Sequence, residues 1–586
     1  MKQKNPSPKR LTVLLRLWNY LYRYKWMLML SLFLTVAGNL LVLIGPMLSG
    51  FAIDAIKPGK GRVAFDKVLD YCALMIVFFL VSSLLSYIQS VFMINLSQKT
   101  IQKMRKDTFE RLVDLPVGYF DQHQTGDIIS RITYDIDTVN TSLSNDLIQI
   151  CTSFITVFGS LIMMLLISPV MVLVFAVTIP LSIFITKYIT AKVRPLFRER
   201  SEKLGELNGF VEEIISGQKT IKAYHQEETM IARFEEKNQA ATQAFYNAEY
   251  YGNIVGPSVN FINNLSISLI SLLGAILFLH QMITVGKLTS FTLYSRKFSG
   301  PINELANIIS ELQSSLAAAE RVFRLMDEPP EPADKPGSVE YRDVSGDVEM
   351  NNISFGYLPD RIVLENLNLK ADRGSLIAIV GPTGAGKTTL INLLMRFYDP
   401  NSGHITLDGT DIKDATRKSL RQAYAMVLQD TWLFHGTIYE NLTYGNDSIP
   451  MEDVIKAAKA VKIHHYIETL PEGYQTVLNE DGINISQGQK QLLTIARAML
   501  SDCNMLILDE ATSNVDTRTE IEIQKAMRVL MQNKTCFIIA HRLSTIENAD
   551  IVLVVKDGNI AEQGSHTELI AKKGIYAELY HSQFQS

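Results

Sequence analysis

The chain has 586 residues, of which 47% are hydrophobic, and a formal net charge of −4. This length predicts several domains, and a charge so close to neutral gives no reason to expect nucleic acid as a partner. The four cysteines are scattered without the spacing of a metal site or a disulfide framework, which favours a reducing compartment or a membrane interior. The N-terminus is basic, but the apolar run that follows is too long for a cleavable signal.

The first element, residues 11–24, mixes Leu, Trp and Tyr with Arg at roughly helical spacing. This pattern predicts a basic amphipathic helix at a membrane surface, an elbow within residues 1–25. An extension of the following helix explains the same pattern equally well.

Long uncharged runs then predict six membrane-spanning helices within residues 26–325. The run 147–186 is too long for one crossing and has Ser168-Pro169 near its middle, so we expect two helices joined by a tight hairpin. The sixth span, 288–312, is interrupted by three charged residues. The remaining runs are 26–53, 71–98 and 251–286.

The placement of lysine and arginine predicts the orientation. These residues gather in the N-terminal arm and in the segments 99–131 and 187–203, whereas the hairpin between the third and fourth spans has none. The loop after the first span is an exception, which nearby aspartates partly offset. We therefore expect both termini in the cytoplasm and the chain in a plasma membrane.

Two charged segments, 99–146 and 187–249, are predicted to be helices that continue beyond the membrane and reverse near 114–127 and 212–222. The Pro-rich, charged stretch 326–346 is typical of a linker. The remainder, 347–586, is predicted to be a soluble α/β domain. Its apolar, strand-like runs are 377–380, 505–508, 536–539 and 551–555.

A phosphate-binding loop lies between the first of these strands and a helix-like pattern. In this context G-x-x-x-x-G-K-[ST] directs backbone N–H groups and the positive end of a helix dipole at an anion. Lys387 can reach the β- and γ-phosphates of a nucleoside triphosphate, and Thr388 can hold Mg²⁺. The loop comprises Gly381, Pro382, Thr383, Gly384, Ala385, Gly386, Lys387, Thr388 and Thr389.

Other residues near the ends of predicted strands carry compatible chemistry. Tyr357 can stack on an adenine ring, and Gln429 can supply an oxygen to Mg²⁺ or water. In the run MLILDE, Asp509 is placed to hold Mg²⁺ and Glu510 to polarise the attacking water. Their side chains point opposite ways on a strand, so they cannot share one role. His541 follows another strand and can contact the γ-phosphate or the water.

The segment Ile485-Ser486-Gln487-Gly488-Gln489 precedes a helix and offers a second helix N-terminus to an anion. Together with Tyr357, GPTGAGKTT, Gln429, LILDEATSNVD and His541, this ordered set resembles an ATP-binding cassette (ABC) domain. With six predicted spans before it, the chain resembles an exporter-type half-transporter. The expected fold is a multi-span α-helical membrane domain fused to an α/β P-loop NTPase domain. YFDQHQTGDIISRITYDID and FVEEIISGQKTIKAY are similar to that family's coupling segments.

The resemblance implies an ATPase that works as a dimer with ATP and Mg²⁺. Each site would join one chain's phosphate loop to the partner's segment Ser486, Gln487, Gly488 and Gln489. Thr388, Gln429 and Asp509 would hold the metal, and Glu510 and His541 would be catalytic. In this chain glutamine replaces a glycine of the family pattern L-S-G-G-Q, and a side chain there can crowd the approach to phosphate.

An intact carboxylate beside an altered signature segment resembles one subunit of bacterial heterodimeric multidrug exporters. The hypothesis is that Glu510 serves the hydrolytic site, which a partner subunit completes. The alternative is a homodimer in which Gln487 is harmless.

Polar residues at membrane depth are candidates for a substrate cavity: Asn39, Asn253, Asn260, Asn263, Asn264, Arg296 and Lys297. Hydrogen bonds between helices explain the asparagines equally well, and snorkelling to an interface explains the cations. The predicted function is ATP-driven export of amphipathic small molecules. A lipid or peptide exporter is the alternative. A cassette ATPase that does not transport anything is a further alternative, which the six predicted spans and the coupling segments disfavour.

Overall fold

The computed structural model divides the chain into two compact units. One comprises residues up to 114 together with 124–328, and the other comprises 115–123 together with 329–586. The segment 115–123 therefore belongs to the compact unit of the C-terminal half, although the membrane helices surround it in sequence. The described residues are 10–56, 63–358, 361–429, 431–446, 448–478, 485–509, 517–540 and 546–584.

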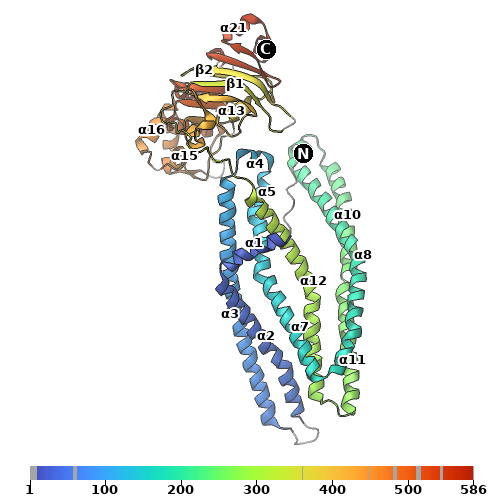
Figure 1. Ribbon diagram of the computed structural model, residues 1–586. Helices are drawn as coiled ribbons and strands as arrows, with labels where there is room; N and C mark the ends of the chain where they lie inside the picture. Colours follow the sequence, from blue (N-terminus) through green and yellow to red (C-terminus); the bar gives the residue numbers. More distant parts are fainter. Residues whose placement is uncertain are drawn as a thin grey trace. The chain divides into compact units, whose positions relative to one another are not determined.

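The first unit consists of long helices, drawn in blue to green in Figure 1. Within the described residues, five helical stretches are long and apolar enough to cross a membrane. They are Lys25–Asp54, Phe65–Val113, Thr125–Ile167, Pro169–Ser216 and Glu227–Leu279. The sixth long helix, α12 (Val285–Asp327), contains Arg296 and Lys297.

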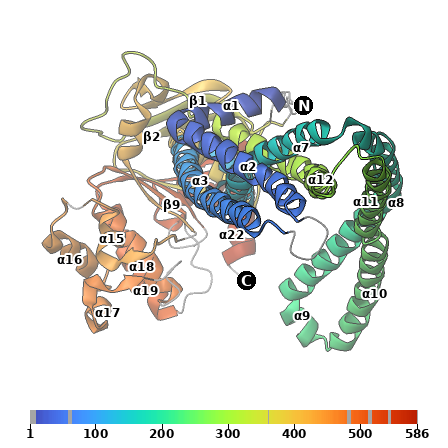
Figure 2. The same ribbon diagram turned by 90° about the horizontal axis from the view of Figure 1, so that it is seen from below.

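Two of these stretches, Thr125–Ile167 and Glu227–Leu279, are composed of more than one helical element. The helices are α2 (Lys25–Asp54), α3 (Phe65–Val113), α7 (Leu147–Ile167), α8 (Pro169–Ser216), α10 (Glu227–Gly252) and α11 (Val255–Leu279). Only Ser168 separates α7 from α8, with Pro169 at the first turn, so the predicted hairpin between two helices is confirmed. Both views show α8 and α11 side by side (Figures 1 and 2).

Short helices lie at the two predicted reversals. After α3 come α4 (Val117–Gln122) and α5 (Thr125–Ser130), and after α8 comes α9 (Gln218–Ala223). Two π-helical turns, η1 (Arg131–Asp135) and η2 (Ser142–Asp146), flank α6 (Ile136–Thr141). None of the residues of α9 is buried.

The N-terminal helix α1 (Arg10–Tyr22) is separate from α2, which begins at Lys25, so it is not an extension of the first span. Its residues Val13, Leu17 and Leu21 recur every four positions and are buried in a core shared with α3 and α12. Leu11, Leu15 and Trp18 remain exposed on the rest of the helix surface. The helix thus has an inner apolar stripe and an outer apolar surface.

The second unit contains a six-stranded sheet in the order β12-β11-β3-β10-β9-β6. All neighbouring strands are parallel except the pair β11 and β12. The strands are β3 (Leu376–Val380), β6 (Tyr424–Val427), β9 (Met505–Asp509), β10 (Thr535–Ile539), β11 (Ile551–Lys556) and β12 (Asn559–Gly564). The four apolar runs identified in the sequence correspond to β3, β9, β10 and β11, so these strand predictions are confirmed.

A four-stranded antiparallel sheet has the order β2-β1-β4-β5. Its strands are β1 (Val348–Phe355), β2 (Leu364–Ala371), β4 (Ser402–Leu407) and β5 (Thr410–Asp411); β7 (Gly436–Thr437) and β8 (Val477–Leu478) form a separate pair. The helices are α13 (Lys387–Leu394), α14 (Arg417–Gln422), α15 (Ile438–Thr443), α16 (Met451–Ala460), α17 (His464–Thr469), α18 (Gln487–Met499), α19 (Thr517–Met531), α21 (His566–Lys572) and α22 (Ile575–Phe584).

The six-stranded sheet is buried on both faces, as parallel sheets generally are. On β9, Leu506 and Leu508 face the core that contains α18 and α19, while Met505 and Ile507 face the core shared with the four-stranded sheet. This alternation follows from the period of two along a strand. Because both faces are covered, the carboxyl ends of the strands are where polar side chains can gather.

Candidate functional site

The phosphate loop connects β3 to α13, and its glycines adopt conformations that other residues avoid. Gly384 and Gly386 have φ values of +82° and +108°. A Cβ added at Gly381 would lie 2.1 Å from the carbonyl oxygen of Val555. Gly386 is the N-cap of α13, so the positive end of that helix faces the loop. The backbone alone therefore forms an anion-binding cradle.

The Lys387 side chain reaches back across the phosphate loop to its first residues. Its Nζ donates hydrogen bonds to the carbonyl oxygens of Gly381 at 2.8 Å and Pro382 at 3.1 Å. Burial lowers the pKa of Lys387, and the negative charge of Asp509 acts in the opposite direction. Asp509 thus lies close enough to interact electrostatically with the lysine, as expected for two strands that end at the same edge of the sheet.

The register of the sheet brings the predicted metal-binding residues to that edge. Asp509 ends β9 and pairs with Ile539 at the end of β10, while Leu508 pairs with Val427 at the end of β6, two residues before Gln429. Thr388 and Gln429 are exposed. Hydroxyl, amide and carboxylate oxygens are suitable ligands for Mg²⁺, which a cassette would bind together with nucleotide phosphates.

Tyr357 is fixed by its hydroxyl and by its ring. The hydroxyl donates to Thr389 Oγ1 at 3.1 Å and accepts from Asn392 Nδ2 at 3.1 Å. The rings of Phe355 and Tyr398 pack edge-on against it, each with a centroid distance of 5.0 Å. The side chain is nevertheless 41% exposed, which leaves surface for a planar base to stack on.

The segment before α18 forms a helix N-terminus with a reciprocal capping box. The Ser486 hydroxyl accepts from the backbone N–H of Gln489, whose side chain accepts from the backbone N–H of Ser486. Gly488 is buried. Gln487, the residue that replaces the family glycine, directs its Nε2 to Thr431 Oγ1 at 3.3 Å and is exposed. It has no left-handed backbone conformation, so glutamine fits here without strain.

The structure brings together the phosphate loop, Tyr357 and Asp509, whereas Glu510 and His541 lie outside the described residues. Sequence reasoning missed Asn392, which orients Tyr357, and Tyr398, which packs on it. No local pattern marks either residue, because their roles follow from how α13 and the turn after it meet β1.

The polar membrane residues are dispersed over several helices. Asn39 Nδ2 donates to Thr35 O at 2.8 Å and to Thr152 Oγ1 at 3.3 Å, which is a bond between α2 and α7. On α11, Asn260 and Asn264 are exposed four residues apart on one helix face, and Asn263 is half-buried. Arg296 is exposed on α12.

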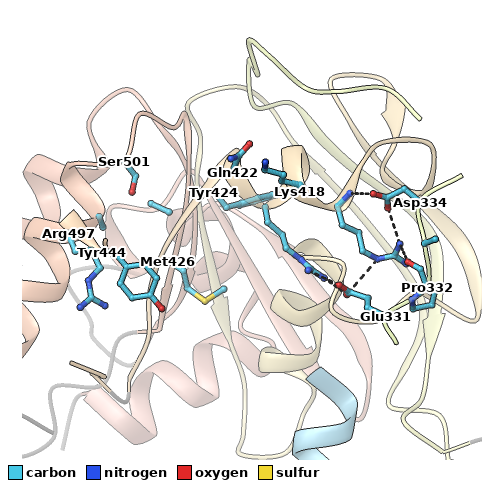
Figure 3. Close-up of a pocket in the computed structure, with 15 residues that line it drawn as sticks. Glu331, Pro332, Asp334, Lys418, Gln422, Tyr424, Met426, Tyr444, Arg497 and Ser501 are labelled. Carbon is cyan, nitrogen blue, oxygen red and sulfur yellow. Dashed lines mark hydrogen bonds and ion pairs between the residues drawn. The ribbon is translucent and has the colours of Figure 1, made fainter. Parts of the chain in front are cut away.

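A pocket of about 870 Å³ lies elsewhere on the second unit, along β6 at the sheet edge (Figure 3). At one end, Arg421 pairs with Glu331 and Arg417 pairs with Asp334. At the other end, Arg497 lies over the Tyr444 ring at 4.9 Å and donates to the carbonyl oxygens of Asn441 and Trp432. Burial lowers the pKa of Arg497. The pocket therefore has polar walls and an aromatic end.

A membrane domain of long helices and a nucleotide-binding α/β domain in one chain define the class of ATP-driven membrane transporters. The family model for the ABC transporter transmembrane region matches residues 28–302, and the model for the ABC transporter matches residues 364–513. The chain belongs to the ABC transporter family and is an ABC exporter whose ATPase activity is coupled to transport. The predicted fold class is confirmed.

Several relatives match over nearly the whole chain. The Bacillus subtilis protein YfiC, an uncharacterised ABC transporter ATP-binding protein, is 44% identical over 97% of this chain and 94% of its own length. A Mycobacterium bovis fatty acid ABC transporter ATP-binding/permease protein is 44% identical over 89% of this chain and 83% of its own length. The Bacillus subtilis protein YgaD, provisionally named for multidrug export, is 34% identical over 97% of this chain and 99% of its own.

Among solved structures, a bacterial Atm1-family ABC exporter with ATP bound matches with a TM-score of 0.76 and 29% identity. The match covers 96% of this chain and 98% of that one. ABC exporters work as dimers in a lipid bilayer, so this chain is half of a membrane transporter that uses ATP.

Proposed function

We propose that this chain exports amphipathic or hydrophobic small molecules across the plasma membrane, with both termini in the cytoplasm. The observation that carries the proposal is the position of α4. This helix follows a membrane helix directly in sequence, yet it belongs to the compact unit of the cassette and hydrogen-bonds to it through Asp121 and Tyr398. Movement of the cassette would thus reach α3, which ends at Val113, through a very short connection.

At the nucleotide site, Tyr357 would stack on adenine and the phosphate loop would hold the phosphates. Lys387 would exchange its hydrogen bonds to loop carbonyls for the β- and γ-phosphates. Thr388, Gln429 and Asp509 would hold Mg²⁺, which neutralises developing charge when bound. Glu510 would polarise the attacking water and His541 would hold it or the γ-phosphate.

Each site would be completed by a second subunit. Within the segment Ser486 to Gln489, Ser486 and Gly488 would contact the γ-phosphate of the partner's ATP at the N-terminus of α18. Because the exposed Gln487 side chain lies at that terminus, it would weaken the site to which this chain contributes the segment. The site that contains Glu510 would be completed by an unaltered partner. We therefore favour a heterodimer over a homodimer.

The second reversal would engage the partner's cassette. In this chain Ile215 and Tyr224, which flank α9, are 67% and 73% exposed, and α9 has no buried residue. A partner subunit would cover these apolar side chains.

Three substrate classes are considered for this exporter: amphipathic small molecules, lipids and peptides. The multidrug name of one relative and the exposed polar side chains of α11 and α12 favour amphipathic molecules, whereas the fatty acid name of another favours a lipid. A peptide exporter is a further alternative. Asn260, Asn264 and Arg296 would line the cavity, with Asn39 and Asn263 beside it.

Inside-out vesicles that contain the transporter test this choice. We expect ATP to drive accumulation of a fluorescent amphipathic dye, and a fluorescent fatty acid to be transported less. Preferential transport of the fatty acid would instead support the lipid alternative. Arg296→Ala is expected to change the preference between the two probes while basal ATPase activity is retained. Unchanged transport of both the dye and the fatty acid would mean that Arg296 does not line the cavity.

A further inference from the structure

Tyr398 connects α4 to the cassette. Its hydroxyl donates a hydrogen bond of 2.5 Å to Asp121 Oδ2 on α4. Gly118, one turn earlier on α4, approaches the same side chain so closely that an added Cβ would lie 3.0 Å from both Tyr398 Cε1 and the hydroxyl oxygen. Burial, and then the Asp121 carboxylate, raise the pKa of Tyr398, so the hydroxyl keeps its proton and remains the donor at neutral pH.

The same ring is part of an aromatic cluster with Tyr357. Tyr398 meets Tyr357 edge-on, with 5.0 Å between centroids and 87° between planes. Phe355 completes the cluster at 5.0 Å from Tyr357 and 5.5 Å from Tyr398, and is itself buried. Edge-to-face packing is sensitive to orientation, so a change in the tilt of one ring alters its contact with the next.

Tyr357 cannot adjust freely when a base stacks on it. Its hydroxyl is held by Thr389, a residue of the phosphate loop, and by Asn392 of α13. With that end of the side chain fixed and Phe355 packed against the ring, a tilt of the Tyr357 ring would mainly change its contact with Tyr398. The far end of Tyr398 is in turn hydrogen-bonded to α4.

We propose that Tyr398 is a positioning residue that transmits adenine binding at Tyr357 to α4, and so to the membrane helix that precedes it. The proposal rests on the proposed function, in which Tyr357 stacks on the adenine of ATP. Under this proposal, binding of the adenine base, and not only of the phosphates, changes the state of the membrane domain. A ligand can shift a conformational equilibrium only through contacts that differ between the two states, and the Tyr357 ring supplies such a contact.

Hydrogen–deuterium exchange of the α4 backbone in the full chain tests this relay. In the wild type, Mg²⁺ with a non-hydrolysable ATP analogue is expected to slow exchange at residues 117–122 at least roughly fivefold, because local opening is suppressed. In Tyr398→Phe, which keeps the ring but loses the hydroxyl, we expect the analogue to bind within about threefold of wild-type affinity while the added protection of α4 is lost. Asp121→Ala should behave in the same way.

Three comparisons make the test specific. Tyr341→Phe removes another half-buried hydroxyl of the cassette, which donates to Thr410 O, and should leave the α4 response intact. Asp121→Asn retains a hydrogen-bond acceptor and should preserve part of the nucleotide-induced protection of α4. Inorganic tripolyphosphate, which fills the phosphate loop without a base, should not protect α4.

Wild-type protection of α4 in nucleotide-bound Tyr398→Phe would overturn the relay, as would equal protection by tripolyphosphate. A failure of the proposed base site is distinguishable. If Tyr357→Ala bound the ATP analogue and tripolyphosphate as the wild type does, Tyr357 would not contact the base, whatever Tyr398 does.

Discussion

At the scale of single residues, we expect position on the sheet to divide the chemistry between two carboxylates, Asp509 and Glu510. Asp509 is the last residue of β9 and interacts electrostatically with Lys387, so we expect its charge to act on the phosphate and metal side of the site. The next residue, Glu510, lies outside the described residues, and its separate role remains a prediction from the sequence. Because adjacent side chains on a strand point opposite ways, the sequence predicts that Glu510 polarises the attacking water.

Glu510→Gln is expected to bind ATP with wild-type affinity but to hydrolyse it at least ~10²-fold more slowly, because the general base is lost while the fold is kept. Steady-state ATPase activity and equilibrium binding of labelled ATP measure the two effects separately. Asp453→Asn, a change at a solvent-accessible carboxylate of α16 that pairs with Lys456, is the matched control. Wild-type turnover by the Glu510 variant would refute the assignment.

Gln487 provides the residue-scale test of subunit composition. If its side chain weakens the segment, the chain purified alone should have low ATPase activity, and Gln487→Gly should raise it roughly fivefold, a change in barrier of about 1 kcal/mol. Gln532→Gly, at an exposed position after α19, should change nothing. Robust, substrate-stimulated ATPase activity of the unmodified chain alone would instead support a homodimer.

At the scale of elements, β9 carries Asp509 to the edge of the sheet and depends on a core on both faces. Leu506 is fully buried at the centre of this strand. Leu506→Ala is expected to lower the free energy of unfolding of the cassette by about 2–5 kcal/mol, through lost apolar contacts and the cavity left behind.

Denaturant unfolding of the full chain can follow the cassette through Trp432, the one tryptophan after residue 328. Val529→Ala on α19, where the side chain is 41% exposed, is the control and should change the stability by no more than about 0.5 kcal/mol. A Leu506→Ala cassette as stable as the wild type would mean that β9 does not anchor the site as described.

The elements were predictable to the extent that their patterns are local. Buried strands such as β3 and β9 are short apolar runs, and the α7–α8 hairpin follows from one Ser-Pro pair. By contrast, the aromatic cluster of Phe355, Tyr357 and Tyr398 depends on packing between segments about 40 residues apart. The contact between Asp121 and Tyr398 joins residues 277 positions apart. No periodicity in the sequence encodes such pairs.

The same distinction applies to the membrane helices. Among the described residues, five helical stretches have the apolar length of a span, whereas α12 carries Arg296 and Lys297 and is recognisable mainly from its place in the helix order. Asn39, which the sequence predicts as a cavity residue, forms a hydrogen bond between α2 and α7. The role of a polar residue at membrane depth can thus be assigned only when its neighbouring helix is known.

At the scale of the whole molecule, the chain joins an ATP-hydrolysing cassette to helices that cross a membrane. The short helix α4 is associated with both parts. It lies between membrane helices in sequence and within the compact unit of the cassette in space. This arrangement is what coupling requires, because chemical change in one part must move another. Transport and hydrolysis should therefore be lost together when Glu510, the proposed catalytic carboxylate, is replaced.

The most direct measurement is ATP-dependent accumulation of a fluorescent amphipathic dye in inside-out vesicles that contain the transporter with its partner subunit. We predict accumulation with ATP and Mg²⁺, none when EDTA removes Mg²⁺, and none in vesicles that contain Glu510→Gln at equal protein level. The proposed outward export from the cell would be contradicted if wild-type vesicles hydrolysed ATP at full rate without accumulating dye or fatty acid, or if the Glu510→Gln vesicles accumulated dye as the wild type does.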